Sequence, residues 1–370
     1  ILVHLLWADD LVLIANTPEG LQKQLDGLFS FCSKFQMIVN EMKTKVMIFG
    51  KNGDQHNFTF NGKNLDIVEQ YKYLGVIINS VSTVRGNIFR EMYKYISDKG
   101  HKSCFVVHKK CSSVGRVNPK ISCHLFDVYV SPILNYSSEL WCKGTQIDCI
   151  ERVHLRFLKQ ILCVKDSTCS TVVYGELGRY PLYVYQFIKL IKYWCRLISL
   201  DKSNLVKKAY VSLRQLHFSG FTNTWVKCIT DVLKKFDLLD YWYNEELITD
   251  EDTFISDFTK IVFNWYEEQW RKSLMDYPIL RTYVNFKNVF ECEEYLLCVR
   301  DRSLRKILTK FRLSSHCLMI EKGRHHKPKI PLEERICKQC TLNVVENEFH
   351  FLIQCPLYHE ERVKLFYNII

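Results

Sequence analysis

The stretch HLLWADDLVLIAN (residues 4–16) places two adjacent aspartates, Asp9 and Asp10, between two short apolar runs. Runs of this length that are rich in branched residues are typical of strands buried on both faces. The acidic pair at their junction therefore predicts the tip of a β-hairpin. Neighbouring carboxylates repel each other, and a hard divalent cation such as Mg²⁺ removes that penalty. The alternative interpretation is that Asp is a common turn residue, and these residues alone do not decide between the two.

The residues that follow, up to position 80, predict mixed α and β structure. Thr17 provides a helix cap ahead of an apolar pattern with helical spacing, and Asn61–Gly62 is a strong hairpin-turn signal. Gly75 lies where a strand pair or a bent strand is expected. The predicted elements are a helix (16–35), a strand (45–50), a first hairpin (58–68) and a second strand pair or bent strand (71–79).

From about residue 85 the apolar spacing is helical throughout, and several helices carry rows of basic residues. Such rows can follow a phosphate backbone, although more often they are solvated helix faces. Two rows in succession in a chain with net charge +11 bring the two interpretations closer together. The rows comprise Arg152, Arg156 and Lys159; Lys189, Lys192 and Arg196; and Arg305 with Lys306 in the basic stretch 300–313.

Composition predicts a folded protein that binds a polyanion. The 370 residues are 47% hydrophobic and 14% aromatic, and Lys and Arg exceed Asp and Glu by 51 to 40. The sixteen cysteines are scattered singly through apolar segments, which predicts reduced thiols in a nuclear or cytoplasmic protein that is not secreted. No apolar run reaches the roughly 18–20 residues that span a bilayer, so no membrane partner is expected.

A cluster of potential zinc ligands lies near the C-terminus. Cys337, Cys340, His350 and Cys355 have the spacing C-x2-C-x9-H-x4-C. With this many cysteines, roughly 0.7 C-x-x-C pairs are expected by chance, but the chance that a His-x4-Cys follows such a pair is only about 0.01. Three thiolates and one imidazole close a tetrahedral Zn²⁺ shell with no open position. The sequence therefore predicts a structural zinc knuckle that folds around its metal.

Taken in order, these segments resemble the C-terminal half of the reverse transcriptases of non-LTR (LINE-type) retrotransposons. WADDLVLIAN (7–16) looks like the family's catalytic hairpin, although Trp7 stands where Phe or Tyr is usual. FQMIVNEMKTKVMIFG (35–50) is similar to the next motif, and YKYLGVIIN (71–79) looks like the hairpin that holds the primer end. The terminal Cys-Cys-His-Cys knuckle stands where these elements carry theirs.

The resemblance implies an RNA-directed DNA polymerase that uses two metal ions for nucleotidyl transfer. It implies that Asp9 and Asp10 bind Mg²⁺ and that Lys43 or Lys45 meets the triphosphate or protonates the leaving group. RNA and DNA, as template and primer, are the implied partners; Tyr73, Leu74 and Gly75 are the implied contact to the primer end. The oligomeric state is left open.

The resemblance also implies that the chain is incomplete as an enzyme, because the family's third metal-binding carboxylate and its fingers come from segments before the hairpin. Only eight residues precede Asp9, so we expect a start that is truncated and a chain that is inactive alone. The alternative function is a non-catalytic RNA- or DNA-binding module. The expected fold is α+β, divided into part of the palm (1–80), a helical thumb (81–200), a helical extension with a basic linker (201–330) and the zinc knuckle (331–370).

Overall fold

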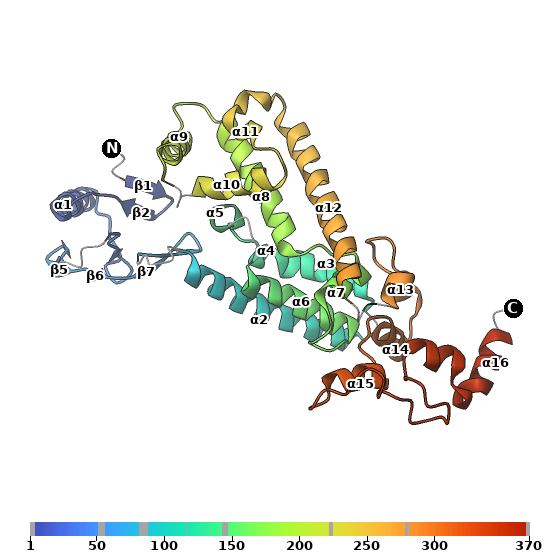
Figure 1. Ribbon diagram of the computed structural model, residues 1–370. Helices are drawn as coiled ribbons and strands as arrows, with labels where there is room; N and C mark the ends of the chain where they lie inside the picture. Colours follow the sequence, from blue (N-terminus) through green and yellow to red (C-terminus); the bar gives the residue numbers. More distant parts are fainter. Residues whose placement is uncertain are drawn as a thin grey trace. The chain divides into compact units, whose positions relative to one another are not determined.

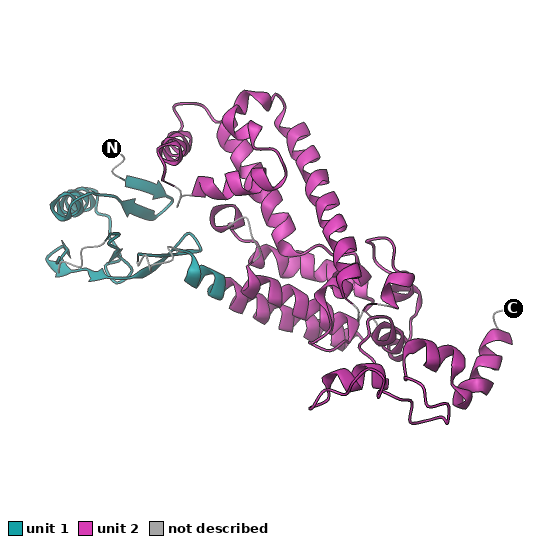
Figure 2. Ribbon diagram, viewed as in Figure 1, with its two compact units in different colours: residues 1–95 teal, residues 96–370 magenta. Residues whose placement is uncertain are grey.

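The computed structural model describes residues 4–50, 56–80, 88–115, 117–142, 147–221, 225–277, 280 and 282–367 (Figure 1). The chain forms two compact units, residues 1–95 and residues 96–370, coloured separately in Figure 2. Short strands lie in the first unit and helices dominate the second, so the α+β fold class is confirmed. The finer division at residues 80, 200 and 330 stays a prediction.

The first unit combines one long helix with short two-stranded sheets. The helix begins where the sequence predicts, because the side chain of Thr17 accepts a hydrogen bond from the Gly20 N–H at 3.1 Å. Helix α1 is Pro18–Lys34, and the strands are β1 (His4–Trp7), β2 (Asp10–Leu13), β3 (Lys45–Val46), β4 (Thr59–Phe60), β5 (Lys63–Asn64), β6 (Asp66–Ile67), β7 (Gln70–Tyr73) and β8 (Val76–Asn79). The pairs β1–β2, β4–β5 and β7–β8 are antiparallel hairpins, and β3 pairs with β6 in parallel.

A small apolar core joins α1 to the sheets of this unit. Leu25 of α1 packs with residues of the β3, β4 and β5 region, and the ring of Phe29 meets that of Phe60 edge-on at 5.8 Å. The side-chain amide of Gln22 both donates to the Thr59 carbonyl and accepts from its N–H, each at 2.9 Å. This amide takes the place of a neighbouring strand beside β4 and fixes α1 against it.

The second unit is helical. Its helices are α2 (Arg90–Val114, which begins in the first unit), α3 (Pro119–Tyr129), α4 (Ser131–Leu134), α5 (Ser138–Trp141), α6 (Asp148–Leu162), α7 (Ser170–Leu177), α8 (Leu182–Ser199), α9 (Leu205–Phe218), α10 (Trp225–Lys235), α11 (Asp240–Tyr243), α12 (Glu251–Asp276), α13 (Tyr295–Cys298), α14 (Arg302–Arg312), α15 (Met319–His325) and α16 (His359–Tyr367). Short 3-10 turns (Glu245–Leu247, Tyr283–Asn285 and Pro356–Tyr358) and one π-helical turn (His350–Gln354) connect them.

Helix α8 lies at the centre of this unit, and α5, α6, α9, α10 and α12 pack around it (Figure 1). Most of its apolar side chains are buried, and Phe187 and Trp194 are fully buried. The indole N–H of Trp194 donates to the Tyr210 hydroxyl at 2.9 Å, so this large ring is buried without an unsatisfied donor. No helix among the described residues is long and apolar enough to span a membrane.

Candidate metal centres and nucleic-acid interface

The acidic pair lies at the tip of an antiparallel hairpin. Trp7 pairs with Asp10 at the end of the β1–β2 ladder, which leaves Ala8 and Asp9 as a two-residue turn. Ala8 has φ = +54°, in the left-handed region, where a residue with a Cβ is strained by about 1–2 kcal/mol. Strained backbone of this kind concentrates at functional sites. The predicted hairpin is confirmed, with Asp9 at its turn and Asp10 at the first position of β2.

This hairpin is more exposed than the sequence suggests. Leu6 and Trp7 are 67% and 68% exposed, and no residue between His4 and Ile14 is buried. The prediction of strands buried on both faces is therefore wrong for the described residues. The reason is that β1 and β2 pair only with each other in the described part of the chain, so no further strand covers their edges. The Asp9 and Asp10 carboxylates are correspondingly open to solvent.

The two candidate lysines of the next motif differ in their surroundings. A tight turn begins at Asn40, whose side chain and carbonyl both accept from the Lys43 N–H at 3.1 Å. Lys45 Nζ forms an ion pair with Asp66 at 2.5 Å, which joins β3 to β6. The Lys43 side chain is exposed and has no hydrogen bond or ion pair to the described residues. Of the two, Lys43 is the cation available to a ligand.

The segment predicted to hold a primer end is a hairpin. Tyr73 and Val76 pair at the end of β7 and β8, and Leu74 and Gly75 form the turn with φ = +46° and +82°. Two positive φ values define the turn type that matches the twist of paired strands, and glycine accepts such a φ without strain. The strand pair is thus confirmed. The hydroxyl of Tyr71 donates to the Lys43 carbonyl at 3.2 Å, which ties this hairpin to the Lys43 turn.

The four predicted zinc ligands come together near the C-terminus. Cys337 N–H donates to Val344 O at 2.9 Å, and this contact folds the chain back after the Cys337–Cys340 turn. His350 begins the π-helical turn, and its N–H donates to the Asn347 side chain at 2.7 Å. At the end of that turn, the Cys355 N–H donates to the His350 carbonyl at 2.8 Å. One ligand atom from each of the four residues then lies within 4.8 Å of all the others.

The donor set fits a divalent cation of the zinc type. Cys337, His350 and Cys355 are almost completely buried, at 4%, 1% and 0% exposed. His350 points Nε2 at Cys340 Sγ, 3.4 Å away, while its buried Nδ1 has no hydrogen-bond partner among the described residues. A filled tetrahedral shell with bonds of about 2.3 Å requires sulfur atoms about 3.8 Å apart. The four ligand atoms lie within 4.8 Å of one another, at most about 1 Å beyond this separation, and small side-chain rotations close the difference.

The zinc-ligand segment is anchored to the helices that precede it. His316 Nε2 and Glu348 Oε1 lie 3.0 Å apart and are buried, and the Glu346 carboxylate accepts from the Met319 N–H at 2.6 Å. Ser315 in turn accepts from the Lys165 N–H at 3.2 Å, beyond the end of α6. The knuckle expected from residue 331 onward is thus hydrogen-bonded to residues 316–320. The sequence does not predict this anchoring, because the carboxylates that form it, Glu346 and Glu348 in the stretch VENEF, follow no recognisable spacing pattern.

The basic rows on α6 and α8 are only partly exposed. Arg152 and Arg156 face solvent, whereas Lys159 is buried and donates to the Asp166 carbonyl. Burial lowers the pKa of the Lys159 ammonium. On α8, Lys189, Lys192 and Arg196 are all exposed, and Lys189 Nζ also donates to the Asn135 carbonyl at 3.1 Å. Five of these six cations are therefore accessible, and Lys159 serves the fold.

The last two basic candidates lie on α14. Arg305 donates to the Val299 carbonyl at 2.8 Å, whereas Lys306 is exposed. Contact of any of these cations with nucleic acid stays a prediction.

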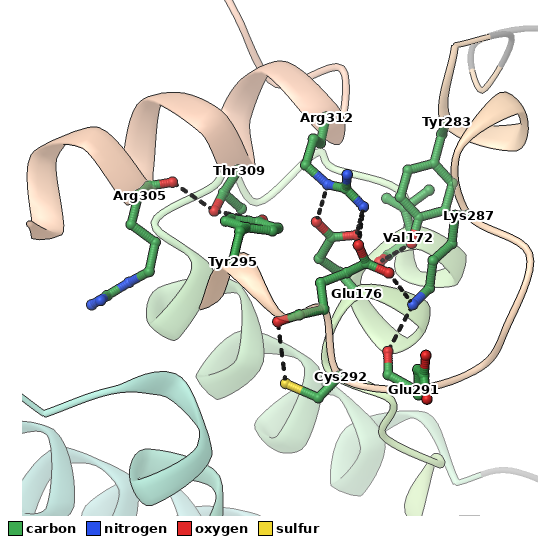
Figure 3. Close-up of polar contacts among 11 residues, drawn as sticks. Val172, Glu176, Tyr283, Lys287, Glu291, Cys292, Tyr295, Arg305, Thr309 and Arg312 are labelled. Atoms are coloured by element: carbon green, nitrogen blue, oxygen red, sulfur yellow. Dashed lines mark hydrogen bonds and ion pairs between the residues drawn. The ribbon is translucent and has the colours of Figure 1, made fainter. Parts of the chain in front are cut away.

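A buried ionic network was not expected from the sequence. The Arg312 guanidinium of α14 donates to Glu176 of α7 at 2.6 Å (Figure 3). Arg312 also pairs with Glu293. Lys287 Nζ binds the other oxygen of Glu293 and the Glu291 carbonyl. Two cations and two carboxylates are thus balanced in the interior, and they fix α14 to α7. In the sequence, the stretch 300–313 looks like an exposed basic segment, because the carboxylates that pair with Arg312 lie outside it.

Comparison with known proteins gives two matches. Residues 2–78 match the family model described as reverse transcriptase (RNA-dependent DNA polymerase). The first unit is similar to reverse transcriptases. A transposon-derived protein of Caenorhabditis elegans is 33% identical over 145 residues, which are 38% of this chain and 49% of the relative. The chain thus matches about half the length of that protein. No solved structure matches the chain.

Proposed function

We propose that this chain is part of a LINE-type retrotransposon reverse transcriptase, an RNA-directed DNA polymerase. The observation that carries the proposal is the hairpin β1–β2, which presents Asp9 and Asp10 at its tip inside the segment similar to reverse transcriptases. The similarity to a transposon-derived protein supports the same origin. The Cys/His cluster near the C-terminal end of the helical unit agrees with the LINE type.

In this proposal Asp9 and Asp10 bind Mg²⁺ at the hairpin tip. Bound there, two such ions would activate a primer hydroxyl and neutralise the leaving pyrophosphate. The residues of this chain supply carboxylate oxygens that are open to solvent and need no rearrangement to accept a cation. Lys43 is the residue assigned to the triphosphate, because Lys45 is engaged with Asp66. Tyr73, Leu74 and Gly75 are assigned to the primer end.

The 370 residues alone are proposed to bind the template and the primer without extending the primer. Two-metal transfer needs a further carboxylate beside the hairpin, and in the described residues the only group of three or more metal-ligating side chains is the Cys/His cluster. An incomplete ligand set does not hold two ions in place. The proposed zinc, bound by Cys337, Cys340, His350 and Cys355, is structural because it leaves no open coordination position.

A non-catalytic RNA- or DNA-binding module is the second candidate function. It is favoured by the exposed row Lys189, Lys192 and Arg196 on one side of α8 and by the overall charge of +11.

We also propose a nuclear or cytoplasmic location. The buried thiols of Cys104 and Cys123, which form no disulfide, support it.

The test is binding of a fluorescent single-stranded RNA and of an RNA–DNA template-primer over a range of salt concentrations, with primer extension measured in the same samples. We expect salt-dependent binding and no extension with Mg²⁺ or Mn²⁺. Replacing the α8 row by alanine should reduce the slope of log affinity against log salt by roughly 0.7 per lost phosphate contact on single strands. The matched control removes three exposed lysines elsewhere on the helical unit: Lys202, Lys208 and Lys272.

Equal slopes for the row and control variants would show that α8 provides no specific interface. Extension that disappears in Asp9→Ala would show instead that the 370 residues form a complete metal site.

A further inference from the structure

The last turn of α15, which is labelled in Figure 1, and the residues after it form a closed loop. The Ile330 N–H donates to the Gly323 carbonyl at 3.0 Å, which brings the two ends of the loop together. Arg335 holds the same end, because its guanidinium donates to the Ile330 carbonyl at 2.9 and 3.0 Å and to the Ile320 carbonyl at 3.0 Å. A Cβ on Gly323 would lie 2.6 Å from the Arg335 side chain, so glycine leaves the space that this closure needs. Residues 322–330 are called the basic loop below.

The basic loop carries an excess of positive charge that no carboxylate of the described residues balances. Its three lysines are exposed, and their side chains have no hydrogen bond or ion pair to the described residues: Lys322, Lys327 and Lys329. Arg335 at the base of the loop is 7% exposed and binds only main-chain carbonyls, which adds a buried cation. Arg324 is the exception, because it forms an ion pair with Glu321 at 2.6 Å. Like charges gathered in this way repel one another, and a polyanion that bridges them relieves the repulsion.

The basic loop also exposes two imidazole rings that are held in place by hydrogen bonds. The guanidinium of Arg324 donates to His325 Nε2 at 3.1 Å, and His326 Nδ1 donates to the Pro328 carbonyl at 2.8 Å. Both histidines are exposed. Planar side chains of this kind, histidine included, stack on the unpaired bases of single strands. The loop therefore combines cations suited to phosphates with planes suited to bases.

We propose that the basic loop binds single-stranded nucleic acid, RNA or DNA, through both its phosphates and its unpaired bases. The free lysines contact phosphate oxygens, and the rings of His325 and His326 stack on bases. Arg335 is a positioning residue, because it closes the loop without reaching the ligand. This site rests on the proposed function, to which it adds a contact separate from the row on α8.

Other occupants fit the basic loop less well. Protein partners bind through buried apolar or aromatic anchors, and Pro328 is the one apolar side chain between residues 322 and 329. Binding to an anionic membrane gains strength from apolar side chains that enter the bilayer, and the loop offers none apart from this proline. In a nucleic-acid duplex the bases are paired and stacked, so the two imidazoles would gain nothing from it.

The experiment measures fluorescence anisotropy of full-length, zinc-loaded chain with three labelled ligands over a range of KCl concentrations. The ligands are a uridine RNA and a thymidine DNA strand, each of about 20 nucleotides, which is longer than a typical single-strand site, and a duplex DNA of the same length. Lys327→Gln with Lys329→Gln should reduce the slope of log affinity against log salt by roughly 1.4 on single strands, and weaken binding about 25-fold at 0.1 M KCl. Lys202→Gln with Lys272→Gln, the matched control, removes the same charge from exposed positions elsewhere and should leave the slope unchanged.

Two further variants separate the base contacts and the closure of the loop from its charge. His325→Ala with His326→Ala should weaken binding to both single strands by about five-fold for each lost stack, and leave duplex binding unchanged. Arg335→Lys keeps the net charge but loses the closing hydrogen bonds, so it should also weaken single-strand binding. Circular dichroism and zinc content are recorded for every variant.

Equal slopes and affinities for the Lys327/Lys329 variant and its control would overturn the proposal, although binding by the wild-type chain would leave the proposed function intact. A wild-type chain that binds no nucleic acid would overturn both. An Arg335→Lys chain that is folded and binds as the wild type does would show that closure of the loop is irrelevant. Equal losses on duplex and single strands in the histidine variant would exclude stacking on bases. Association with vesicles of phosphatidylcholine and phosphatidylserine that the Lys327/Lys329 variant abolishes, without a change in RNA binding, would assign the loop to a membrane.

Discussion

Replacing Glu176 by leucine removes one carboxylate from the buried network that holds α14. The Glu176 side chain is 0% exposed, and that of its partner Arg312 is 16% exposed. In the wild-type chain two cations and two carboxylates balance one another. The variant leaves Arg312 and Lys287 with Glu293 alone, a net charge of +1 in the interior.

Breaking a buried ion pair by removing one partner costs about 3–5 kcal/mol, because the remaining charge is desolvated without compensation. Arg312 keeps Glu293 and some solvent contact, so we expect a loss near the lower end, about 3 kcal/mol. That is a large part of the about 5–15 kcal/mol by which domains are stable. The assay is urea unfolding followed by tryptophan fluorescence, which reports on the helical unit because all tryptophans except Trp7 lie there.

Two controls separate the network from a general effect of losing a charge. Asp231→Asn breaks an exposed ion pair with Lys227, and it should change the stability by no more than about 0.5 kcal/mol. The double variant Glu176→Leu with Arg312→Met leaves Lys287 paired with Glu293, and it should cost less than Glu176→Leu alone. The reasoning would be refuted if Glu176→Leu were as stable as Asp231→Asn. It would also be refuted if the stability lost by the double variant equalled the sum of the losses of its two single variants.

Three further predictions concern the metal, one backbone position and pH. Elemental analysis should find one zinc per chain, and none in Cys340→Ser; zinc-free wild-type protein would contradict the site. Gly178→Ala, with φ = +56° and a new Cβ 2.6 Å from backbone atoms, should cost more than the about 1–2 kcal/mol of the φ alone, whereas Gly27→Ala in open space on α1 should stabilise slightly in thermal unfolding. Burial raises the pKa of Tyr174 and Tyr283, so the folded state holds these protons more tightly than the unfolded state. The resulting stability is present below about pH 10 and is lost above it; phenolate absorbance and circular dichroism should change together, and ionisation of every tyrosine near pH 10 in a folded chain would contradict this.

Local signals in the sequence predicted local structure well. Thr17 caps α1, and Asn61–Gly62 and Leu74–Gly75 form hairpin turns, because each depends on neighbouring residues only. The Cys/His spacing also predicted a cluster, since four ligands of one metal must lie close together.

Properties that depend on distant residues could not be predicted in this way. Lys159 looks like part of a cationic row, but its ammonium is used by the Asp166 carbonyl. Arg312 lies in a basic stretch, yet its partner Glu176 is 136 residues away. Leu304 and Ile307 of α14 stay exposed because that pairing turns the Arg312 side of the helix toward the protein, and no local pattern predicts this. The apolar runs of hairpin β1–β2 predict burial on both faces. Burial also requires a neighbouring strand, and the residues of the hairpin do not indicate whether one is present.

The central claim, that β1–β2 is a nucleotidyl-transfer hairpin, is tested most directly by grafting. Residues 4–14 would replace the catalytic hairpin of an active LINE-type reverse transcriptase, and DNA synthesis on an RNA template would be measured with and without Mg²⁺. Asp9→Ala in the graft is the matched variant. The account predicts Mg²⁺-dependent synthesis by the graft and none by the Asp9→Ala graft. Equal synthesis by both grafts, or none by either, would contradict it.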